Sequence, residues 1–303
     1  MKKSSNIISS PSEKVIKIIM HIFLSILALL CIIPFLYVLG SSFQTQNDIM
    51  LNGYRIIPKE ATFETYRMIF ESPDRLVNAY VVTIFTTIVG TIVGLWIMST
   101  YAYVISRRTY RYKNILSFLI FFTMLFSGGL VPSYILMTRW LGLRDNILAV
   151  ILPGLASAWN IMLMKGFFQD IPESLLEAAR IDGASELGVF VRIVCPISKP
   201  AFATIGLFLV LGYWNEWYNC LLYIESPDKV TLQYMLMTIM NNVELLNSAE
   251  AVQYGIAAQG AVSAPTLGAR MAMCVLAAGP MLFVFLFFQK YFVSGLKVGS
   301  VKG

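Results

Sequence analysis

Six long apolar stretches are the feature of this sequence that most constrains its fold. A helix needs about 20 predominantly apolar residues to cross the hydrocarbon core of a bilayer. The stretches run approximately over residues 18–39, 79–104, 116–137, 147–168, 201–224 and 271–288. Since 57% of the residues are hydrophobic and only 13% are charged, an ordinary soluble domain is excluded. The sequence therefore predicts an all-α, polytopic membrane protein with six transmembrane helices.

Basic residues predict how these helices are oriented. Lys and Arg are enriched in the cytoplasmic loops of membrane proteins, and here they gather in the N-terminal tail and after the sixth stretch. The short loop after the second stretch is also basic and contains Arg107, Arg108, Arg111 and Lys113. Residues 44–77 are mixed in charge, and residues 225–267 hold four acidic residues and one lysine, as expected of outer loops. We therefore expect both termini in the cytoplasm. A nucleic-acid-binding patch is the alternative for the basic loop, but its position between two membrane spans argues against it.

The predicted organisation is a cytoplasmic tail over residues 1–17, a six-span domain over residues 18–294 and a glycine-rich cytoplasmic tail over residues 295–303. The first stretch is longer than the core of a signal peptide and no convincing cleavage site follows it, so we expect it to be retained. The outer segment 44–77 is expected to form a small cap with one short helix. Apolar residues at helical spacing from Leu232 to Val243 predict an amphipathic helix that is too short and too polar to span.

Glycine and proline residues mark two special places in the apolar stretches. Gly90 and Gly94 have GxxxG spacing, which lets a second helix approach closely. The third stretch is interrupted by Ser127–Gly129 and by Pro132, and these residues predict a kink whose freed backbone groups need other partners. A kink beside a transport pathway and a kink that serves only packing are both consistent with the sequence.

A cluster of aromatic and polar residues lies in the second half of the fifth stretch, which reads GYWNEWYNC. One continuous helix would place Tyr213, Glu216, Trp217 and Cys220 on one face. A carboxylate inside a membrane helix is costly and usually faces a cavity or a partner, and aromatic rings with amide groups suit a sugar. The candidate substrate path consists of Tyr213, Trp214, Asn215, Glu216, Trp217 and Asn219, with Asn160 from the fourth stretch. The alternative is an aromatic belt at the outer membrane interface.

Several classes of site are excluded or unsupported by the sequence. His21 is the only histidine, so a multi-histidine metal centre is excluded. The four cysteines lie in or beside apolar stretches without CxxC spacing, and we expect them to behave as small hydrophobic side chains. The sequence contains no GxxxxGK(S/T), so we expect no P-loop for ATP. A membrane enzyme would need a nucleophile and base or metal ligands on the spans, and the sequence offers no such set.

The longest expected cytoplasmic interruption is residues 170–200, which we call the coupling stretch. Its pattern predicts two short helices joined by a sharp turn. Pro172 suits the first turn of the first helix, and Gly183 suits its end, where a left-handed residue is needed. The second helix is predicted over approximately Ser185 to Val194, with Pro196 ending it. An amphipathic helix pair that only lies at the membrane interface is the alternative.

The coupling stretch resembles the coupling loop of ABC-importer permeases. Glu177-Ala178-Ala179, Gly183, Ile193 and Pro196 stand at the family's spacing, and Cys195 replaces the usual leucine. The resemblance implies that the ATPase-coupling residues are Glu177, Ala178, Ala179, Asp182, Gly183, Ile193 and Pro196. The segment SGGLVPSY and the tail GLKVGSVKG are similar to permeases of carbohydrate importers related to the maltose importer. The nearest resemblance is to the branch for complex oligosaccharides and pectin-type sugars.

The resemblance also implies an assembly in the bacterial cell membrane. This chain would be a non-catalytic permease subunit that pairs with a second, different permease, two ATPase subunits and an extracellular solute-binding lipoprotein. It would bind no cofactor, because ATP and magnesium belong to the ATPase subunits, and it would have no nucleic-acid partner. The cargo would be an oligosaccharide. A non-sugar cargo within the same superfamily is one alternative. An ion-coupled secondary transporter is another, although such proteins show several buried ionisable residues and inverted repeats.

Overall fold

The computed structural model describes residues 11–71, 73–246 and 267–299. Within these ranges the regular structure is helical, apart from an isolated bridge between Gln44 and Ala61. The all-α prediction is therefore confirmed. The chain divides into two compact units, which are residues 1–69 with 245–275 and residues 70–244 with 276–303.

The first unit contains long and short helices. They are α1 (Pro11–Ser41), α2 (Gln46–Asn52), most of α3 (Glu64–Glu71) and the start of α17 (Leu267–Gly299). Buried Gln44 holds the cap together, because its Nε2 donates to Asp48 Oδ2 at 2.8 Å and its Oε1 accepts from Arg55 N at 3.0 Å. Residues 44–77 contain two short helices rather than the single one expected, since Thr45 caps an additional helix by accepting a hydrogen bond from Asp48 N.

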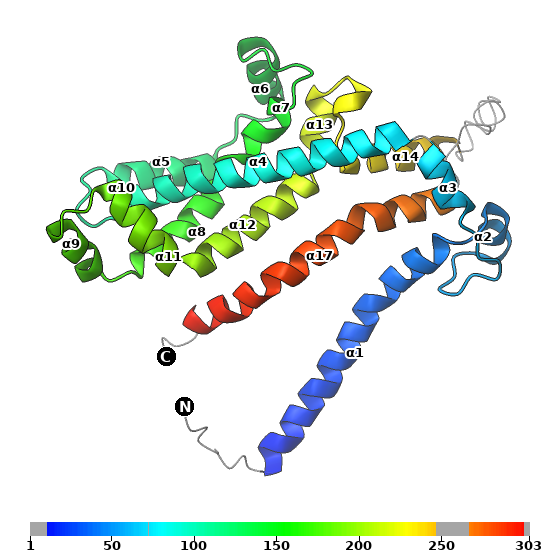
Figure 1. Ribbon diagram of the computed structural model, residues 1–303, viewed down its shortest axis with the longest axis horizontal. Coiled ribbons are helices and arrows are strands. Elements are labelled where there is room, and N and C mark those ends of the chain that lie inside the picture. The colour runs from blue at the N-terminus through cyan, green and yellow to red at the C-terminus, as the bar shows by residue number, and fades with distance from the viewer. Residues whose placement is uncertain (1–10, 72, 247–266, 300–303) are drawn as a thin grey trace. The chain divides into compact units, whose positions relative to one another are not determined.

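The second unit is built on α4, the long helix Pro73–Ser106. It packs against α8 (Ala158–Gln169) and α12 (Lys199–Trp214), and α5 (Lys113–Leu125) packs against α4 and α8 (Figure 1). Met98, Phe168 and Ile205 are fully buried members of the core that these helices share. This core is where the second unit buries most of its large apolar side chains.

The GxxxG prediction on α4 is confirmed by its contacts with α12. A Cβ atom at Gly90 would lie 2.4 Å from the Tyr213 ring, so only glycine permits this approach. A Cβ atom at Gly94 would lie 3.4 Å from Leu209, which is at the edge of ordinary van der Waals contact. Of the two glycines, Gly90 is therefore the one that leaves no room for a side chain.

Among the residues that the structure describes, three helical segments are long and apolar enough to span a membrane. They cover residues 15–41 in α1, 74–106 in α4 and 267–289 in α17. Three bent pairs raise the number of candidate spans to six, in agreement with the sequence. The pairs are α5 with α6 (Leu130–Ile135) and η1 (Leu136–Trp140); α7 (Leu148–Ile151) and η2 (Leu152–Gly154) with α8; and α10 (Glu186–Val189), η3 (Phe190–Val194) and α11 (Cys195–Ile197) with α12.

The expected kink in the third stretch is a much sharper turn. The axes of α5 and the α6–η1 segment differ by 111°. Gly129 precedes α6 with a φ of 85°, a left-handed value that glycine adopts at little cost. Pro132 follows within the first turn of α6, where a missing N–H is tolerated. The sequence located this break correctly but did not give its size.

The fifth stretch is not one continuous helix, so the predicted shared face of Tyr213, Glu216, Trp217 and Cys220 is wrong. Helix α12 ends at Trp214, and α13 covers Tyr218–Tyr223. A short 3₁₀ turn, η4 (Pro227–Lys229), follows, and then α14 (Leu232–Leu246). The amphipathic helix expected from Leu232 is therefore confirmed, and both Leu232 and Leu236 are buried.

Candidate functional site

The coupling stretch folds as the predicted helix pair. Its first helix, α9, covers Glu173–Ile181, with Pro172 immediately before it. Gly183 N donates to Arg180 O and Ala184 N donates to Ala179 O, which together form a Schellman motif. Gly183 has a φ of 85°, so its predicted role in the turn is confirmed.

The second helix of the pair extends further than the sequence predicts. Ser185 caps α10 by accepting a hydrogen bond from Gly188 N at 3.2 Å, and the helix continues through η3 and α11 to Ile197. Pro196 does not end it. The π-helical turn η3 ends at Val194, and Pro196 lies in α11, which continues the helix. A local π-helical adjustment of this kind lets a helix continue through a proline. The chain instead bends by 84° at Ser198, between α11 and α12.

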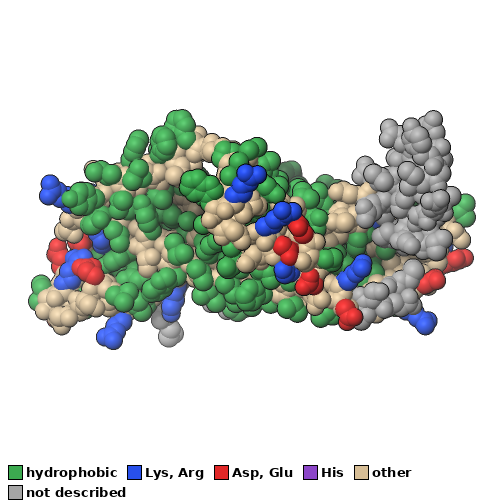
Figure 2. Space-filling view, turned by 90° about the horizontal axis from the view of Figure 1, so that it is seen from above, with side chains coloured by type: hydrophobic (Ala, Val, Ile, Leu, Met, Phe, Trp, Pro, Cys, Tyr) green, Lys and Arg blue, Asp and Glu red, His purple; other side chains and the backbone are tan. Residues whose placement is uncertain are grey.

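The helix pair buries one face and exposes the other. Leu176 on α9 and Phe190 on η3 belong to the same core as Met98 of α4. The exposed face includes Ile181, an apolar side chain that is 85% exposed beside the turn, and Leu187, which is 59% exposed. Red and blue side chains gather at the left end of Figure 2, where Figure 1 places α9 and α10. The pair is thus anchored on one side and open on the other.

The predicted coupling residues divide between these two faces. Glu177, Ala178, Asp182, Gly183 and Pro196 are exposed, whereas Ala179 is buried and Ile193 is half-buried. Ala178, Asp182 and Gly183 lie on or beside the same turn as Ile181, which the sequence did not single out. Glu177 lies one helical turn earlier on α9, and Pro196 lies at the far end of the second helix. Ala179 and Ile193 face the rest of the second unit, so packing accounts for their apolar side chains.

An ionic network fixes the helix pair to α4, and the sequence did not reveal it. Arg180 Nε donates to Glu186 Oε1 at 2.6 Å, and Arg180 Nη1 lies 3.4 Å from Glu173 Oε1. Tyr103 on α4 donates its hydroxyl to Glu186 Oε2 at 3.0 Å. Arg107, just after α4, places Nη1 3.6 Å from Glu173 Oε2 and its guanidinium carbon 5.0 Å from the centre of the Tyr103 ring. These five residues are called the ionic network below.

Electrostatics act in opposite directions on the two arginines of the ionic network. The Glu186 carboxylate raises the pKa of Arg180 above its ordinary value. Burial lowers the pKa of Arg107, and Glu173 acts in the opposite direction. Both guanidinium groups stay protonated, because arginine does not lose its proton in proteins. A buried arginine needs a partner of opposite charge. Glu173 at the start of α9 supplies it for Arg107, and this ion pair holds α9 to the end of α4.

Two residues of the candidate substrate path are buried packing residues. The Tyr213 hydroxyl donates to Ile151 O at 2.8 Å, and Trp214 Nε1 donates to Ala277 O at 3.0 Å. Asn160 is also buried, in the first turn of α8. None of these three side chains lines the groove described below.

The remaining path residues surround the break after α12. Glu216 Oε1 accepts from Asn219 N at 2.7 Å, and its Oε2 accepts from Asn219 Nδ2 at 2.9 Å. Asn215 Nδ2 donates to Leu211 O, one turn earlier in α12, at 2.9 Å. Polar side chains that bond to nearby backbone compete with helix formation, which explains why the helix breaks here. Trp217 lies at the break and is 38% exposed.

One groove brings Asn219 together with residues of the sharp turn. Its volume is about 500 Å³, and its polar lining includes Ser127, Ser133, Tyr218, Asn219 and Tyr223. The groove therefore lies between α6 and α13, which are the two elements that follow breaks in the third and fifth stretches. Ser127 and Ser133 come from the SGGLVPSY segment, which the sequence had linked to a transport pathway only as one of two explanations.

Metal ligands do not gather in the part of the chain that the structure describes. No group of three or more His, Cys, Asp or Glu side chains has a metal-binding arrangement there. The prediction that this chain binds no cofactor of its own stays a prediction.

Comparisons with known proteins give concordant results. Residues 87–298 match the family described as the inner membrane component of binding-protein-dependent transport systems. The chain is 40% identical to "Protein LplC" of Bacillus subtilis (strain 168), over 93% of each chain. It is 40% identical to the "Polygalacturonan/rhamnogalacturonan transport system permease protein YtcP" of the same organism, over 93% of this chain and 96% of that protein. A solved bacterial ABC transporter involved in the import of the acidic polysaccharide alginate has a chain that is 30% identical, with a TM-score of 0.78, covering 94% of this chain and 99% of that one.

Proposed function

Because this chain belongs to the family of inner membrane components of binding-protein-dependent transport systems, we propose that it is the permease subunit of an ATP-driven importer for oligosaccharides. It spans the membrane several times. Its partners in this proposal are a second, homologous permease, two ATPase subunits that bind ATP and magnesium, and an extracellular solute-binding lipoprotein. This chain carries out no chemistry itself, and both of its termini lie in the cytoplasm.

The observation that carries the proposal is the two-sided helix pair. Its inner face shares a core with α4 through Leu176 and Phe190, and the ionic network adds charged contacts to that core. Its outer face presents Glu177, Gly183 and the exposed apolar side chain of Ile181. An apolar side chain at the tip of an exposed turn is suited to insertion into a cleft on a partner. We therefore assign the outer face to the ATPase subunit.

The proposed cargo is an oligosaccharide, of the acidic kind in particular. Two similar proteins are named for polygalacturonan/rhamnogalacturonan transport and for the import of alginate. The groove between α6 and α13 offers Tyr218, Tyr223 and Asn219, which are side chains suited to sugar rings and hydroxyls. We propose this groove, rather than Tyr213 and Trp214, as the part of this chain closest to the cargo.

The assembly can be tested by gentle affinity purification of the tagged chain from its membrane, with co-purifying proteins identified by mass spectrometry. We expect an ATPase and a second permease. Ile181→Asp should lose the ATPase and keep the second permease, whereas Leu175→Asp, which changes another exposed apolar residue of α9 further from the turn, serves as the matched control. Recovery of the folded chain alone would contradict the proposal and favour a secondary transporter.

The turn itself can be tested with two substitutions at Gly183. Open space surrounds a Cβ atom at this position, so only the φ of 85° penalises a side chain. Gly183→Val should abolish oligosaccharide uptake, because a β-branched residue is strongly strained at positive φ, whereas Gly183→Asn should retain most of it. Both variants should be present in the membrane in equal amounts. Equal uptake by the two variants would show that the turn geometry does not matter for transport.

A further inference from the structure

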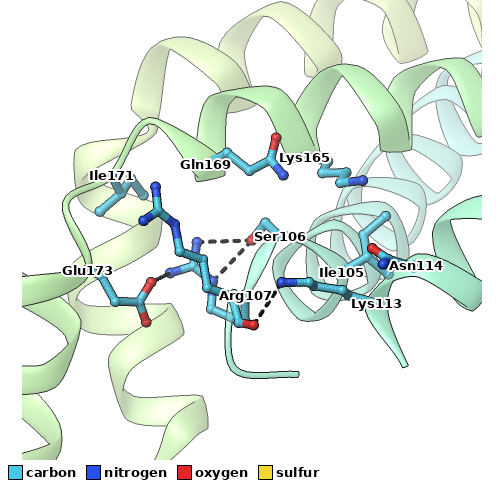
Figure 3. A pocket seen from close by; sticks show the side chains of 10 residues that line it. Ile105, Ser106, Arg107, Lys113, Asn114, Lys165, Gln169, Ile171 and Glu173 are labelled. Atoms are coloured by element: carbon cyan, nitrogen blue, oxygen red, sulfur yellow. Dashed lines mark hydrogen bonds and ion pairs between the residues drawn. The ribbon is translucent and has the colours of Figure 1, made fainter. Parts of the chain in front are cut away.

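A small basic pocket lies where α4 ends, α5 begins and α8 ends. Figure 3 shows the side chains that line it. Its volume is about 170 Å³. Four cationic side chains line it, from Arg107, Arg108, Lys113 and Lys165, and Glu173 is its only acidic residue. Sites for ordinary small molecules occupy roughly 300–1,000 Å³. The pocket therefore suits one small anionic group rather than a sugar or a nucleotide.

Arg107 brings a buried positive charge to the wall of the pocket. The residue is only 5% exposed, and its Nε and Nη2 both donate to Ser106 Oγ, at 3.1 and 3.0 Å. Nη2 also donates to Phe168 O at 2.8 Å. Nη1 has no hydrogen-bond partner among the described residues, because Glu173 Oε2, at 3.6 Å, is too distant for a hydrogen bond. Nη1 itself is closed off from solvent, so Arg107 contributes to the pocket through its charge.

Lys113 and Lys165 on the pocket wall each make one hydrogen bond that positions the ammonium group and leaves other N–H donors available. Lys165 Nζ donates to Ser117 Oγ at 2.9 Å, and Lys113 Nζ donates to Arg108 O at 2.8 Å. Each ammonium group has three donors, so each can make further bonds. Lys113 is also the first residue of α5, and the first turn of this helix contains no acidic residue. The positive end of the helix dipole therefore adds to the positive charge of the pocket.

We propose that this pocket binds a phosphate group, as the phosphodiester of an anionic phospholipid or as free inorganic phosphate. Phosphate oxygens would accept from Lys113 Nζ and Lys165 Nζ, and the guanidinium group of Arg107 would add its positive charge at the pocket wall. The pocket lies at the end of the apolar segment 74–106, which is the depth of lipid headgroups. A bound phosphate would lie beside Glu173 and thus beside the start of α9. This site is additional to the proposed transport function and does not depend on it.

The test uses the full-length chain with its co-purifying subunits, delipidated in detergent. Phosphatidylglycerol and phosphatidylcholine are titrated separately, and the lipid retained per chain is measured by native mass spectrometry. We expect the protein to retain phosphatidylglycerol in preference to phosphatidylcholine. Lys165→Gln and Lys113→Gln should each weaken the binding of phosphatidylglycerol about fivefold, because each substitution removes one positive charge. Arg111→Gln is the matched control, because Arg111 is an exposed residue of the same loop that does not line the pocket.

A second arm distinguishes the source of the phosphate. The apparent Tm is measured in inorganic phosphate and in chloride at equal ionic strength. If free phosphate is the ligand, phosphate should raise the apparent Tm of the unmodified protein but not that of Lys165→Gln. Binding of phosphatidylglycerol without a response to inorganic phosphate assigns the site to lipid. Absence of both responses, or equal loss of binding in Arg111→Gln and Lys165→Gln, would overturn the proposal. Neither arm measures transport, so failure here leaves the importer assignment intact.

Discussion

Gly90→Ala should destabilise this protein, although alanine is the better helix former. The added Cβ atom would lie 2.4 Å from the Tyr213 ring, so the ring or the backbone must move. The ring cannot move easily, because Tyr213 is 4% exposed and its hydroxyl is bonded to Ile151 O. Gly154 also lies against this side chain, since a Cβ atom there would be 2.7 Å from the hydroxyl oxygen.

The expected size of this effect follows from two opposing terms. Overpacking a well-filled core costs about 1–3 kcal/mol, and replacing glycine by alanine within a helix returns up to about 1 kcal/mol. Gly94→Ala is the matched control on the same helix, because its Cβ atom would meet Leu209 at 3.4 Å. A change of 1 kcal/mol in the free energy of unfolding shifts the Tm of a protein of this size by about 2–4 °C. Gly90→Ala should therefore lower the apparent Tm by several degrees, whereas Gly94→Ala should leave it unchanged or raise it.

The assay is thermal unfolding of the purified protein in detergent, completed by a double-mutant cycle. Tyr213→Leu removes the obstructing ring, so adding Gly90→Ala in that background should cost nothing or stabilise the protein. The two substitutions must therefore be non-additive, as expected for residues in contact. Equal apparent Tm values for Gly90→Ala and Gly94→Ala, or additive effects in the cycle, would refute the packing role of Tyr213 and restore it to the substrate path.

The remaining predictions concern charged groups at opposite ends of the second unit. Hydrogen bonds, first of all from Lys229, hold the pKa of Asp145 well below 3.8, so its stabilising contribution is present above that pH and is lost as the pH falls below it. Asp145→Asn should therefore flatten the decline in apparent Tm between pH 5 and pH 3, about the ordinary range of an aspartate; an unchanged profile would contradict this role. Glu173→Gln removes the carboxylate beside buried Arg107 and should destabilise the protein by about 1–3 kcal/mol, seen as a lower apparent Tm. Glu177→Gln, on the exposed face of the same helix, should stay within about 0.5 kcal/mol while reducing uptake; the reverse order would contradict the division of α9 into two faces.

Sequence reasoning located the membrane helices well, because the thickness of the hydrocarbon core of the bilayer sets the length of apolar sequence that a spanning helix needs. It did not find the break between α12 and α13, since hydrophobic periodicity treats GYWNEWYNC as one helix. The break arises from local competition, in which Glu216 bonds to Asn219 and Asn215 bonds back to Leu211. A cluster of Asn and Glu side chains that can satisfy nearby backbone groups was the available signal.

The same reasoning found the turn of the coupling stretch but not its attachment. Gly183 was predictable because left-handed backbone after a helix selects glycine. The bonds from Tyr103 to Glu186 and from Arg107 to Phe168 O join residues 83 and 61 positions apart, and no local pattern encodes such distances. Arg107 was instead interpreted as one more charge of a cytoplasmic loop, because the positive-inside rule counts basic residues without regard to their burial.

The attachment of the helix pair bears directly on how force could reach the membrane helices. Leu176 and Phe190 are buried with Met98 of α4, and the packed interior of a protein shifts as a body rather than deforming continuously. If an ATPase subunit moves the exposed turn, α9 cannot rotate alone without removing Glu173 from buried Arg107, and leaving that cation unpaired is costly. The motion that preserves both contacts carries α4 along with the pair. Because α8 and α12 pack on α4, one rigid group of helices would then reorient, with the breaks at Gly129 and Asn215 as the places where the chain can bend.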